Sequence, residues 1–333
     1  MEKKRDVAID DLKGLLVSVM VFAHVVQFFP RGIETWILGE YANLTTFSGF
    51  VFSFGYVSYY AYIKKKSKLK KRLIKNILKT YIAFCISGTG YCFLVEGGTI
   101  KETIIQVLTL KKVPGYSEFL LSFVLLYVEV YLISIVKKDD KFFYIIGIIV
   151  SLCSTFINYT YVHSNLIGSI IGTTNYTCFP IVQYTVYLLM GMYLAEKQII
   201  FDKKVIGLSI VGTGIFCIYC LINRELPTRF PPSVYWILGG GLFIYMYYLL
   251  MKSKYGVIFK KIQLIRLMGA NSLVFLVVSN LVIFSGKKVL GEWYWATYHL
   301  KEDVIYIWII VFCTSISMSY AVTWIINRLK HIE

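Results

Sequence analysis

The chain has 333 residues, of which 57% are hydrophobic and 16% charged, and its mean hydropathy is +0.64. An average soluble domain has about 45–50% apolar and about 25% charged residues, so this composition excludes a soluble protein. The net charge of +16 does not indicate nucleic-acid binding, because the Lys and Arg residues lie at the edges of apolar segments, where anionic lipid headgroups attract them.

Ten apolar segments are expected to cross the membrane as helices, since a span needs about 17–25 apolar residues and lipid offers no partner for an open backbone group. The expected spans are 12–30, 47–63, 80–95, 118–136, 142–158, 179–196, 205–222, 233–251, 267–285 and 304–326. The polar stretch 159–178 is expected to form a re-entrant or capping loop. The predicted fold is all-α, a polytopic transmembrane helical bundle in which residues 1–333 form a single membrane domain.

The distribution of positive charge predicts the orientation of the chain. With the N-terminus inside, 26 of the 35 Lys and Arg residues fall on the cytoplasmic side, nine of them between Lys64 and Lys79. This agrees with the positive-inside rule and predicts an even number of spans with cytoplasmic N- and C-termini. The expected location is the cell membrane, as a multi-pass protein, with a bacterial plasma membrane as the expected case.

The first expected span contains an ionisable residue, His24, within an apolar run. Ionisable residues at membrane depth are costly and are candidates for function. Lys13 and Asp10 lie at the cytoplasmic edge of the same span, and eleven residues of helix place Lys13 and His24 on nearly one face, roughly 16 Å apart along the axis. A neutral imidazole at this depth can act as a general base, or it can be a buried histidine hydrogen-bonded to a neighbouring helix.

Two further polar residues are candidates for binding. Glu129 lies inside the fourth expected span, where it can form a hydrogen bond between helices or act as a catalytic acid. Arg229 lies in a short outer loop before Pro231 and Pro232, where it can contact a glycan or mark the membrane interface. No metal site is expected.

The opening of the chain carries a recognisable pattern: Asp10-Asp11-Leu12-Lys13-Gly14, and then His24 after ten intervening residues. This pattern resembles the start of the acyltransferase-3 family, particularly its polysaccharide and fucose O-acetylase-like members. Other segments similar to that family follow in order along the chain: Phe52-Ser53-Phe54-Gly55-Tyr56, the basic run Lys70 to Lys75 followed by Tyr81, Phe179-Pro180 to Gly191, Arg229 to Pro232, and Met268-Gly269 to Leu273.

The resemblance implies acyl transfer from a cytoplasmic acyl-CoA, with acetyl-CoA as the expected donor, to a hydroxyl of a cell-surface or capsular polysaccharide or its precursor. It implies His24 as the catalytic base and a glycan or lipid-linked sugar as the acceptor. Membrane lipids are expected as further partners of the protein. Donor phosphates are expected to bind to three cations by charge-assisted hydrogen bonds: Lys13, Arg72 and Lys75. Asp10, Glu129 and Arg229 are assigned to substrate binding.

The chain departs from the family pattern at several positions. The family often has a His about seven residues after the Ser that matches Ser272, where this chain has Ser279-Asn280. A Trp-containing motif that opens the fourth span is replaced here by Tyr116-Ser117-Glu118-Phe119. His24 is the only family histidine retained, so a catalytically degenerate member, or a transporter or flippase for a glycan or lipid-linked intermediate, remains an alternative. A general base needs a second group to hold its other ring nitrogen, and the sequence offers Glu129 or Tyr56 for this role.

Overall fold

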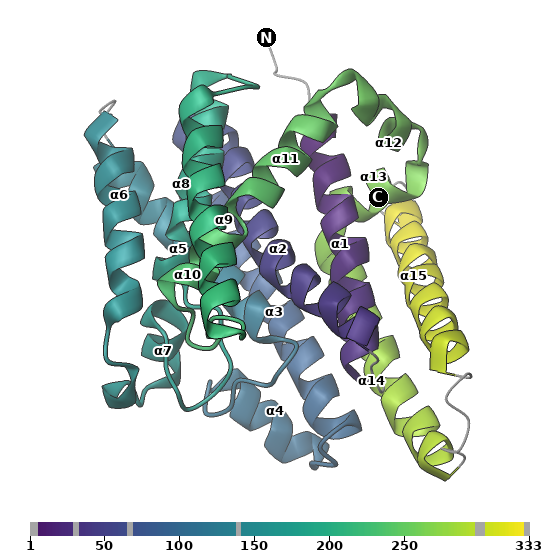
Figure 1. The fold of residues 1–333 in the computed structure, drawn as a ribbon. Helices are drawn as coiled ribbons and strands as arrows, with labels where there is room; N and C mark the ends of the chain where they lie inside the picture. Colours follow the sequence, from purple (N-terminus) through teal and green to yellow (C-terminus); the bar gives the residue numbers. More distant parts are fainter. Residues whose placement is uncertain (1–5, 29–32, 65–68, 138–140, 297–303, 330–333) are drawn as a thin grey trace. The chain divides into compact units, whose positions relative to one another are not determined.

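A computed structural model gives the fold and describes residues 6–28, 33–64, 69–137, 141–296 and 304–329 (Figure 1). These residues are mostly helical, and no β-strand occurs among them, which agrees with the predicted all-α class. The α-helices are α1 (Val7–Phe28), α2 (Ile33–Ser58), α3 (Leu69–Leu94), α4 (Ile100–Leu108), α5 (Glu118–Val136), α6 (Lys141–Cys153), α7 (Asn165–Ile171), α8 (Ile181–Lys197), α9 (Lys203–Asn223), α10 (Val234–Gly239), α11 (Gly241–Lys252), α12 (Val257–Lys261), α13 (Gln263–Ala270), α14 (Ser272–Ala296) and α15 (Val304–Leu329). A π-helical turn, Tyr59–Lys64, follows α2.

Within the described residues, six segments are long and apolar enough to cross a membrane. They are Leu69–Leu94, Glu118–Val136, Lys203–Asn223, Val234–Lys252, Ser272–Val289 and Trp308–Leu329. The other four expected spans correspond to α1, α2, α6 and α8, which are helical but fall outside this set. The chain is therefore an all-helical membrane protein, and the number of ten spans stays a prediction.

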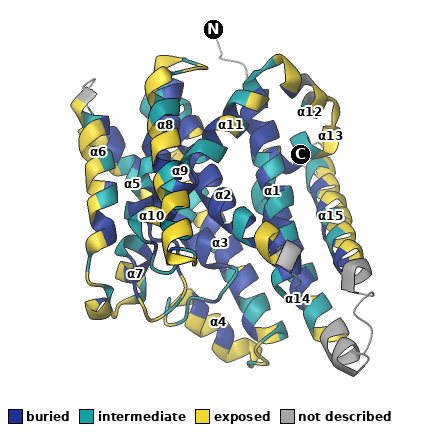
Figure 2. Ribbon diagram, in the orientation of Figure 1, coloured by how far each residue is buried: buried dark blue, intermediate teal, exposed yellow. Residues whose placement is uncertain are grey.

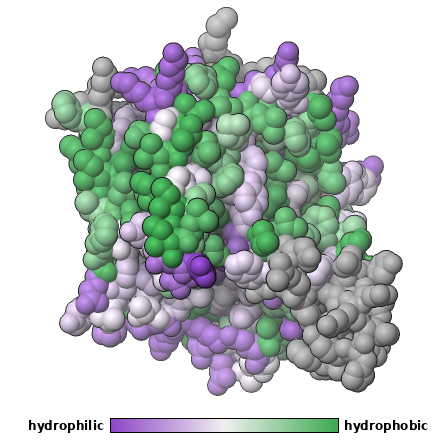
Figure 3. All heavy atoms as spheres, viewed as in Figure 1, coloured by the Kyte–Doolittle hydropathy of each residue, from purple (hydrophilic) through white to green (hydrophobic). Residues whose placement is uncertain are grey.

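The surface of α9 has the character of a helix that faces lipid. Leu208 and Leu221 on this helix are 71% and 77% exposed, and most of its visible side is exposed (Figure 2). Hydrophobic side chains cover that side, and hydrophilic ones gather near the ends of the helix (Figure 3). A polar solvent would strongly disfavour so continuous an apolar face, whereas lipid would not, so this helix supports the membrane assignment.

Several boundaries differ from those expected. The third span was expected to begin at residue 80, but α3 begins at Leu69, because Lys and Arg are good helix formers and the basic run simply continues the helix. The span expected at 233–251 is interrupted at Gly240, where the hydroxyl of Thr213 donates to the Gly239 carbonyl and accepts from the Leu242 amide.

Two more boundaries were not anticipated. The span expected at 267–285 is divided at Asn271 into α13 and α14. The stretch expected as a loop at 159–178 contains the short helix α7, whose first turn is capped by the hydroxyl of Ser164. Both cases follow from the preference of Asn and Ser for helix ends, where their side chains bond to the backbone.

The chain divides into two compact units. Unit 1 comprises Met1–Thr46, Ala83–Ser117 and Ile258–Glu333, and unit 2 comprises Phe47–Ile82 and Glu118–Val257. Helices α2 and α3 contribute residues to both units. The expectation of one membrane domain over the whole chain stays a prediction.

In unit 1, α1 packs against α13, α14 and α15. The contact with α13 is so close that a Cβ atom on Gly269 would lie 1.7 Å from the carbonyl oxygen of Asp10, and one on Gly14 would lie 1.9 Å from that of Ile265. Only glycine fits at these two positions. Because Gly14 and Gly269 belong to two separate sequence motifs, the contact explains why glycine occurs in both.

Unit 2 is built on a similar contact between α2 and α8. A Cβ atom on Gly55 would lie 2.1 Å from the carbonyl oxygen of Leu188, and one on Gly191 would lie 2.1 Å from that of Phe52. In the same unit, α6 and α7 pack on α8, α5 contacts α7 and α8, and α9 packs on both α10 and α11. The motif that contains Gly55 and the motif that ends at Gly191 thus meet within one unit.

Candidate active site

His24 lies on α1 in the interior of unit 1. Its side chain is buried, and the apolar residues around it on the helix, such as Val21 and Val25, are buried as well. The ring nitrogen Nδ1 lies 2.9 Å from Oδ1 of Asn280 on α14. Since a polar group without a partner is costly at such a place, this hydrogen bond accounts for how the imidazole is accommodated.

Asn280 is the centre of a polar network in unit 1. Its Nδ2 donates to Oγ of Ser87 at 3.0 Å and to the backbone carbonyl of Tyr116 at 2.8 Å. The hydroxyls of Ser87 and Ser117 are 2.8 Å apart. Three segments that are distant in sequence, namely α3, the residues before α5, and α14, therefore converge on His24.

Aromatic rings border this network. The ring of Tyr116 meets that of His24 edge to face, with centroids 5.1 Å apart, and also lies 4.5 Å from the ring of Phe28. The ring of Tyr91 packs against both Tyr116 and Phe284. These rings restrict the imidazole to a small range of orientations.

The N-terminal end of α1 carries charged side chains. Lys13 forms an ion pair with Asp10 at 2.9 Å, and Arg266 on α13 approaches Asp11 at 3.4 Å. Asp11 is only 1% exposed, whereas the Arg266 side chain is 41% exposed. The structure thus brings Asp10 and Lys13 together and adds Arg266, a cation that the sequence analysis did not single out.

The other end of α1 is polar too. Gln27, three residues after His24, donates to Oδ1 of Asn43 at 3.0 Å, and Asn43 donates to Glu40 at 3.3 Å. Lys287 on α14 donates to the carbonyl oxygen of Phe28 at 3.2 Å. Polar groups therefore occur on unit 1 at both ends of α1 and, at His24, between them.

The remaining predicted site residues belong to unit 2. Arg72 and Lys75 are exposed on the first turns of α3, three residues apart and hence on one side of the helix. Glu129 on α5 accepts at Oε1 from the hydroxyl of Thr185 on α8 at 2.5 Å. Arg229 lies over the ring of Phe230, with 4.5 Å from its guanidinium carbon to the ring centroid.

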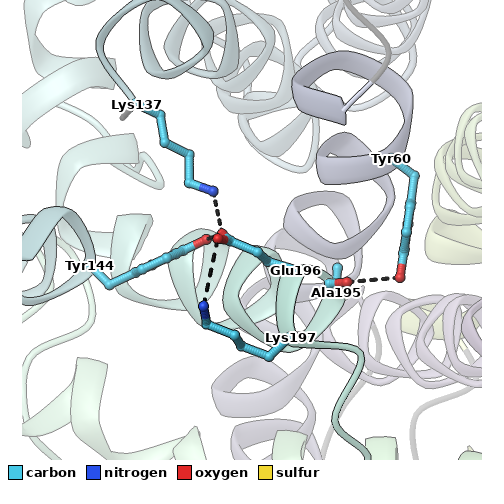
Figure 4. A network of polar contacts seen from close by, with 6 residues as sticks. All are labelled: Tyr60, Lys137, Tyr144, Ala195, Glu196 and Lys197. Atoms are coloured by element: carbon cyan, nitrogen blue, oxygen red, sulfur yellow. Dashed lines mark hydrogen bonds and ion pairs between the residues drawn. The ribbon is translucent and has the colours of Figure 1, made fainter. Parts of the chain in front are cut away.

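Unit 2 also contains an ionic network centred on Glu196, near the end of α8 (Figure 4). Its carboxylate accepts hydrogen bonds from Lys137 and Tyr144, and Lys197 lies 3.9 Å away. The side chain of Lys137 is 4% exposed, and its ammonium also lies 5.1 Å from the centre of the Tyr59 ring. This network ties α5, α6 and α8 together.

The model of the acyltransferase-3 family, described as an acyltransferase domain, matches residues 6–328. The chain belongs to this family. No curated protein and no solved structure matches the chain. Membership makes acyltransferase activity the general expectation for the chain, and it agrees with the resemblance seen in the sequence motifs.

The hydrogen-bond partner of His24 in this family member was not predicted from the sequence. The sequence offered Glu129 and Tyr56 as holders of the second ring nitrogen, but the hydrogen bond at Nδ1 is made with the amide oxygen Oδ1 of Asn280. A signal was present, because Asn280 is a polar residue in an apolar run and stands close to where the family often has a histidine. Among the residues that the structure describes, no group of three His, Cys, Asp or Glu is placed to hold a metal ion.

Proposed function

We propose that this protein is an integral membrane O-acyltransferase. It moves an acyl group, with acetyl as the expected one, from cytoplasmic acyl-CoA to a hydroxyl of a cell-surface or capsular polysaccharide or its precursor. Membership of the acyltransferase-3 family supports the reaction class. The observation that carries the proposal is the buried imidazole of His24, held at Nδ1 by Asn280 inside an apolar helix.

The proposed donor site uses cations expected at the cytoplasmic face. Lys13, Arg72 and Lys75 would bind the phosphates of acyl-CoA, since ammonium and guanidinium groups form strong, charge-assisted hydrogen bonds with phosphate. The exposure of Arg72 and Lys75 on one side of α3 suits this role. Arg266 on α13, which approaches Asp11 at the N-terminal end of α1 near Lys13, is a further candidate.

The proposed chemistry is direct transfer. His24 takes the proton of the acceptor hydroxyl as the oxygen attacks the thioester carbonyl. A C–O bond forms, the C–S bond breaks, and coenzyme A leaves as a thiolate. The imidazolium of His24 then returns the proton to that thiolate, so that the enzyme ends the cycle unchanged.

The proposed acceptor is a glycan or a lipid-linked sugar. Its hydroxyls need polar partners, for which Asp10, Glu129 and Arg229 are proposed. Oε2 of Glu129 is buried and has no hydrogen-bond partner among the described residues, so it can accept from a hydroxyl. Arg229, in a loop expected on the outer side, carries guanidinium donors for the same purpose.

The proposed topology has ten spans with both termini in the cytoplasm, in the cell membrane of a bacterium. The excess of Lys and Arg on one side of the expected spans supports this orientation. Acyl-CoA is a cytoplasmic metabolite and surface glycans lie outside, so an enzyme that spans the membrane can meet both substrates.

The test is analysis of the glycan made with and without the protein. Cells that lack it, and cells that carry it on a plasmid, are compared for ester-linked acetyl groups by NMR and mass spectrometry of purified surface polysaccharide. Loss of a defined O-acyl group without the protein, and its return with the plasmid, is the expected result. An unchanged O-acyl pattern combined with the accumulation of a lipid-linked intermediate would instead indicate a transporter.

A further inference from the structure

The imidazole of His24 is held by a side chain whose own orientation is fixed. Asn280 has no exposed surface, and each end of its amide has a defined neighbour. On one side lies Nδ1 of His24, at 2.9 Å, and on the other lie the Ser87 hydroxyl and the Tyr116 carbonyl. The direction of the Asn280 amide therefore decides which ring nitrogen of His24 carries the proton.

The carbonyl of Tyr116 determines the direction of the Asn280 amide. A backbone carbonyl can only accept, so the amide atom 2.8 Å from it must be the NH2 group. Reversing the amide would place two acceptor oxygens against each other in a buried site, which is strongly unfavourable. The amide oxygen of Asn280 therefore faces His24.

This orientation sets the tautomer of His24. An amide oxygen only accepts, so Nδ1 must donate and must carry a proton. A neutral imidazole has one N–H group, and its second nitrogen, Nε2, then carries no proton. Nε2 is consequently the basic nitrogen.

The backbone conformation of Tyr116 indicates that the surrounding structure holds the Tyr116 carbonyl, and with it the Asn280 amide, in place. Tyr116 has a φ of 60°, in the left-handed region that an aromatic residue rarely adopts, and its carbonyl is the acceptor for Asn280. Such a conformation persists only where the surrounding structure enforces it, and it occurs preferentially at functional sites. The ring of Tyr116, packed on His24 and Phe28, provides part of that support.

Two departures from the family pattern meet at this site. Asn280 and Ser279 stand close to where the family often has a histidine, and Tyr116 and Ser117 replace a Trp-containing motif. Asn280 bonds to both His24 and Tyr116, so the two departures are parts of one network. Unlike a histidine or a carboxylate, an amide does not titrate, so it fixes the tautomer without exchanging a proton with the base.

We propose that Asn280 is a positioning residue that holds His24 as the Nδ1–H tautomer, so that Nε2 is the nitrogen that takes the proton of the acceptor. The role of Nε2 rests on the proposed acyl transfer, whereas the tautomer itself does not. The loss of the late family histidine thus leaves the base intact, since Asn280 supplies the orientation that the base requires.

The experiment is solid-state NMR of the full chain in lipid bilayers at neutral pH, with ¹⁵N-labelled histidine. The chain has four histidines, and the His24 signals are assigned as those absent from His24→Gln. The expected spectrum for His24 has a protonated Nδ1 and an unprotonated Nε2. A protonated Nε2, alone or together with a protonated Nδ1, would overturn the proposal whatever the activity of the protein.

The variant Asn280→Ala tests whether Asn280 fixes the tautomer of His24. The His24 signals are expected to show both tautomers. By analogy with groups that orient metal-bound histidines, kcat is expected to fall by about 10–100-fold, with KM for acetyl-CoA nearly unchanged. The matched control is Ser279→Ala, because among the described residues the Ser279 hydroxyl bonds only to its own helix, at Leu276, so this variant is expected to keep the tautomer. A single, unchanged tautomer in Asn280→Ala would overturn the role of Asn280.

The two measurements separate this inference from the proposed function. If the wild-type protein has the Nδ1–H tautomer but transfers no acyl group, the inference stands and the proposed function fails. If transfer is active and His24 is protonated at Nε2, the inference fails and the function stands.

Discussion

The His24 network of unit 1 and the Glu196 network of unit 2 differ in whether a charged group faces a charged partner. In unit 2, the carboxylate of Glu196 is matched by the ammonium of Lys137 and by the hydroxyl of Tyr144, so its charge is neutralised inside the network. In unit 1, the imidazole of His24 is matched by Asn280, an uncharged amide. An ion pair stabilises the charged form of both partners. A neutral amide instead fixes the position of an imidazole, and the imidazole can still gain and lose a proton. We therefore expect the Glu196 network to stabilise the protein and the His24 network to carry the chemistry.

The strongest test of this contrast is His24→Gln. Glutamine keeps a hydrogen-bonding side chain but cannot accept a proton, so acyl transfer should fall by about 10²–10⁴-fold while the protein still accumulates in the membrane. Transfer of acetyl to the glycan is measured in membranes that contain equal amounts of each variant. The control is His163→Gln, which makes the same change at an exposed histidine. Near-normal transfer by His24→Gln would show that the histidine is structural.

The converse test is Lys137→Met. Removing Lys137 takes away the closest cation of a partly buried carboxylate, so stability should fall by about 3 kcal/mol. This is the lower end of the usual range, because Tyr144 still donates to Glu196 and Lys197 lies 3.9 Å from it. Thermal unfolding in detergent gives the change, with Lys204→Met, an exposed lysine of unit 2, as the control. The transfer rate of each folded molecule should stay near that of the wild type. A large loss of transfer with unchanged stability would reverse the roles of the two networks.

A smaller effect is expected when the exposed cations of α3 are neutralised. Arg72→Gln combined with Lys75→Gln should raise the KM for acetyl-CoA by about tenfold, because lost charge-assisted hydrogen bonds to phosphate weaken donor binding. The control is Lys203→Gln with Lys204→Gln, which removes the same charge from another exposed pair of unit 2. If the KM does not change, the basic run only orients the protein in the membrane. An equal rise in both double variants would point to surface charge in general.

The orientation can be tested by thiol labelling. Lys71→Cys should react with a membrane-impermeant reagent only after the cells are opened, whereas Thr228→Cys should react in intact cells. The native Cys178 should contribute little background, since burial raises the pKa of its thiol to about 12 and leaves hardly any thiolate at neutral pH. Labelling of Lys71→Cys from outside would overturn the proposed topology.

The glycines of the sequence motifs show which part of the fold could be predicted from the sequence. The sequence marks Gly14, Gly55, Gly191 and Gly269 as parts of four separate motifs, but it does not pair them. The structure joins Gly14 and Gly269 to the contact of α1 with α13, and Gly55 and Gly191 to the contact of α2 with α8. The pairing depends on which backbones approach each other, and sequence distance carries no information about that.

The sequence by itself determined that this is a helical membrane protein of the acyltransferase-3 family, and it identified His24 as the candidate base. These conclusions rest on local properties, namely runs of apolar residues, the position of charges beside them, and the short spacing between Lys13 and His24 on one helix. Only the tertiary structure decided what holds His24. Its partner Asn280 is 256 positions away in the chain, and the direction of that amide depends on the Tyr116 carbonyl, which a third segment supplies. Such a network arises only when separate helices pack, because hydrogen bonds act over about 3 Å whatever the distance along the chain.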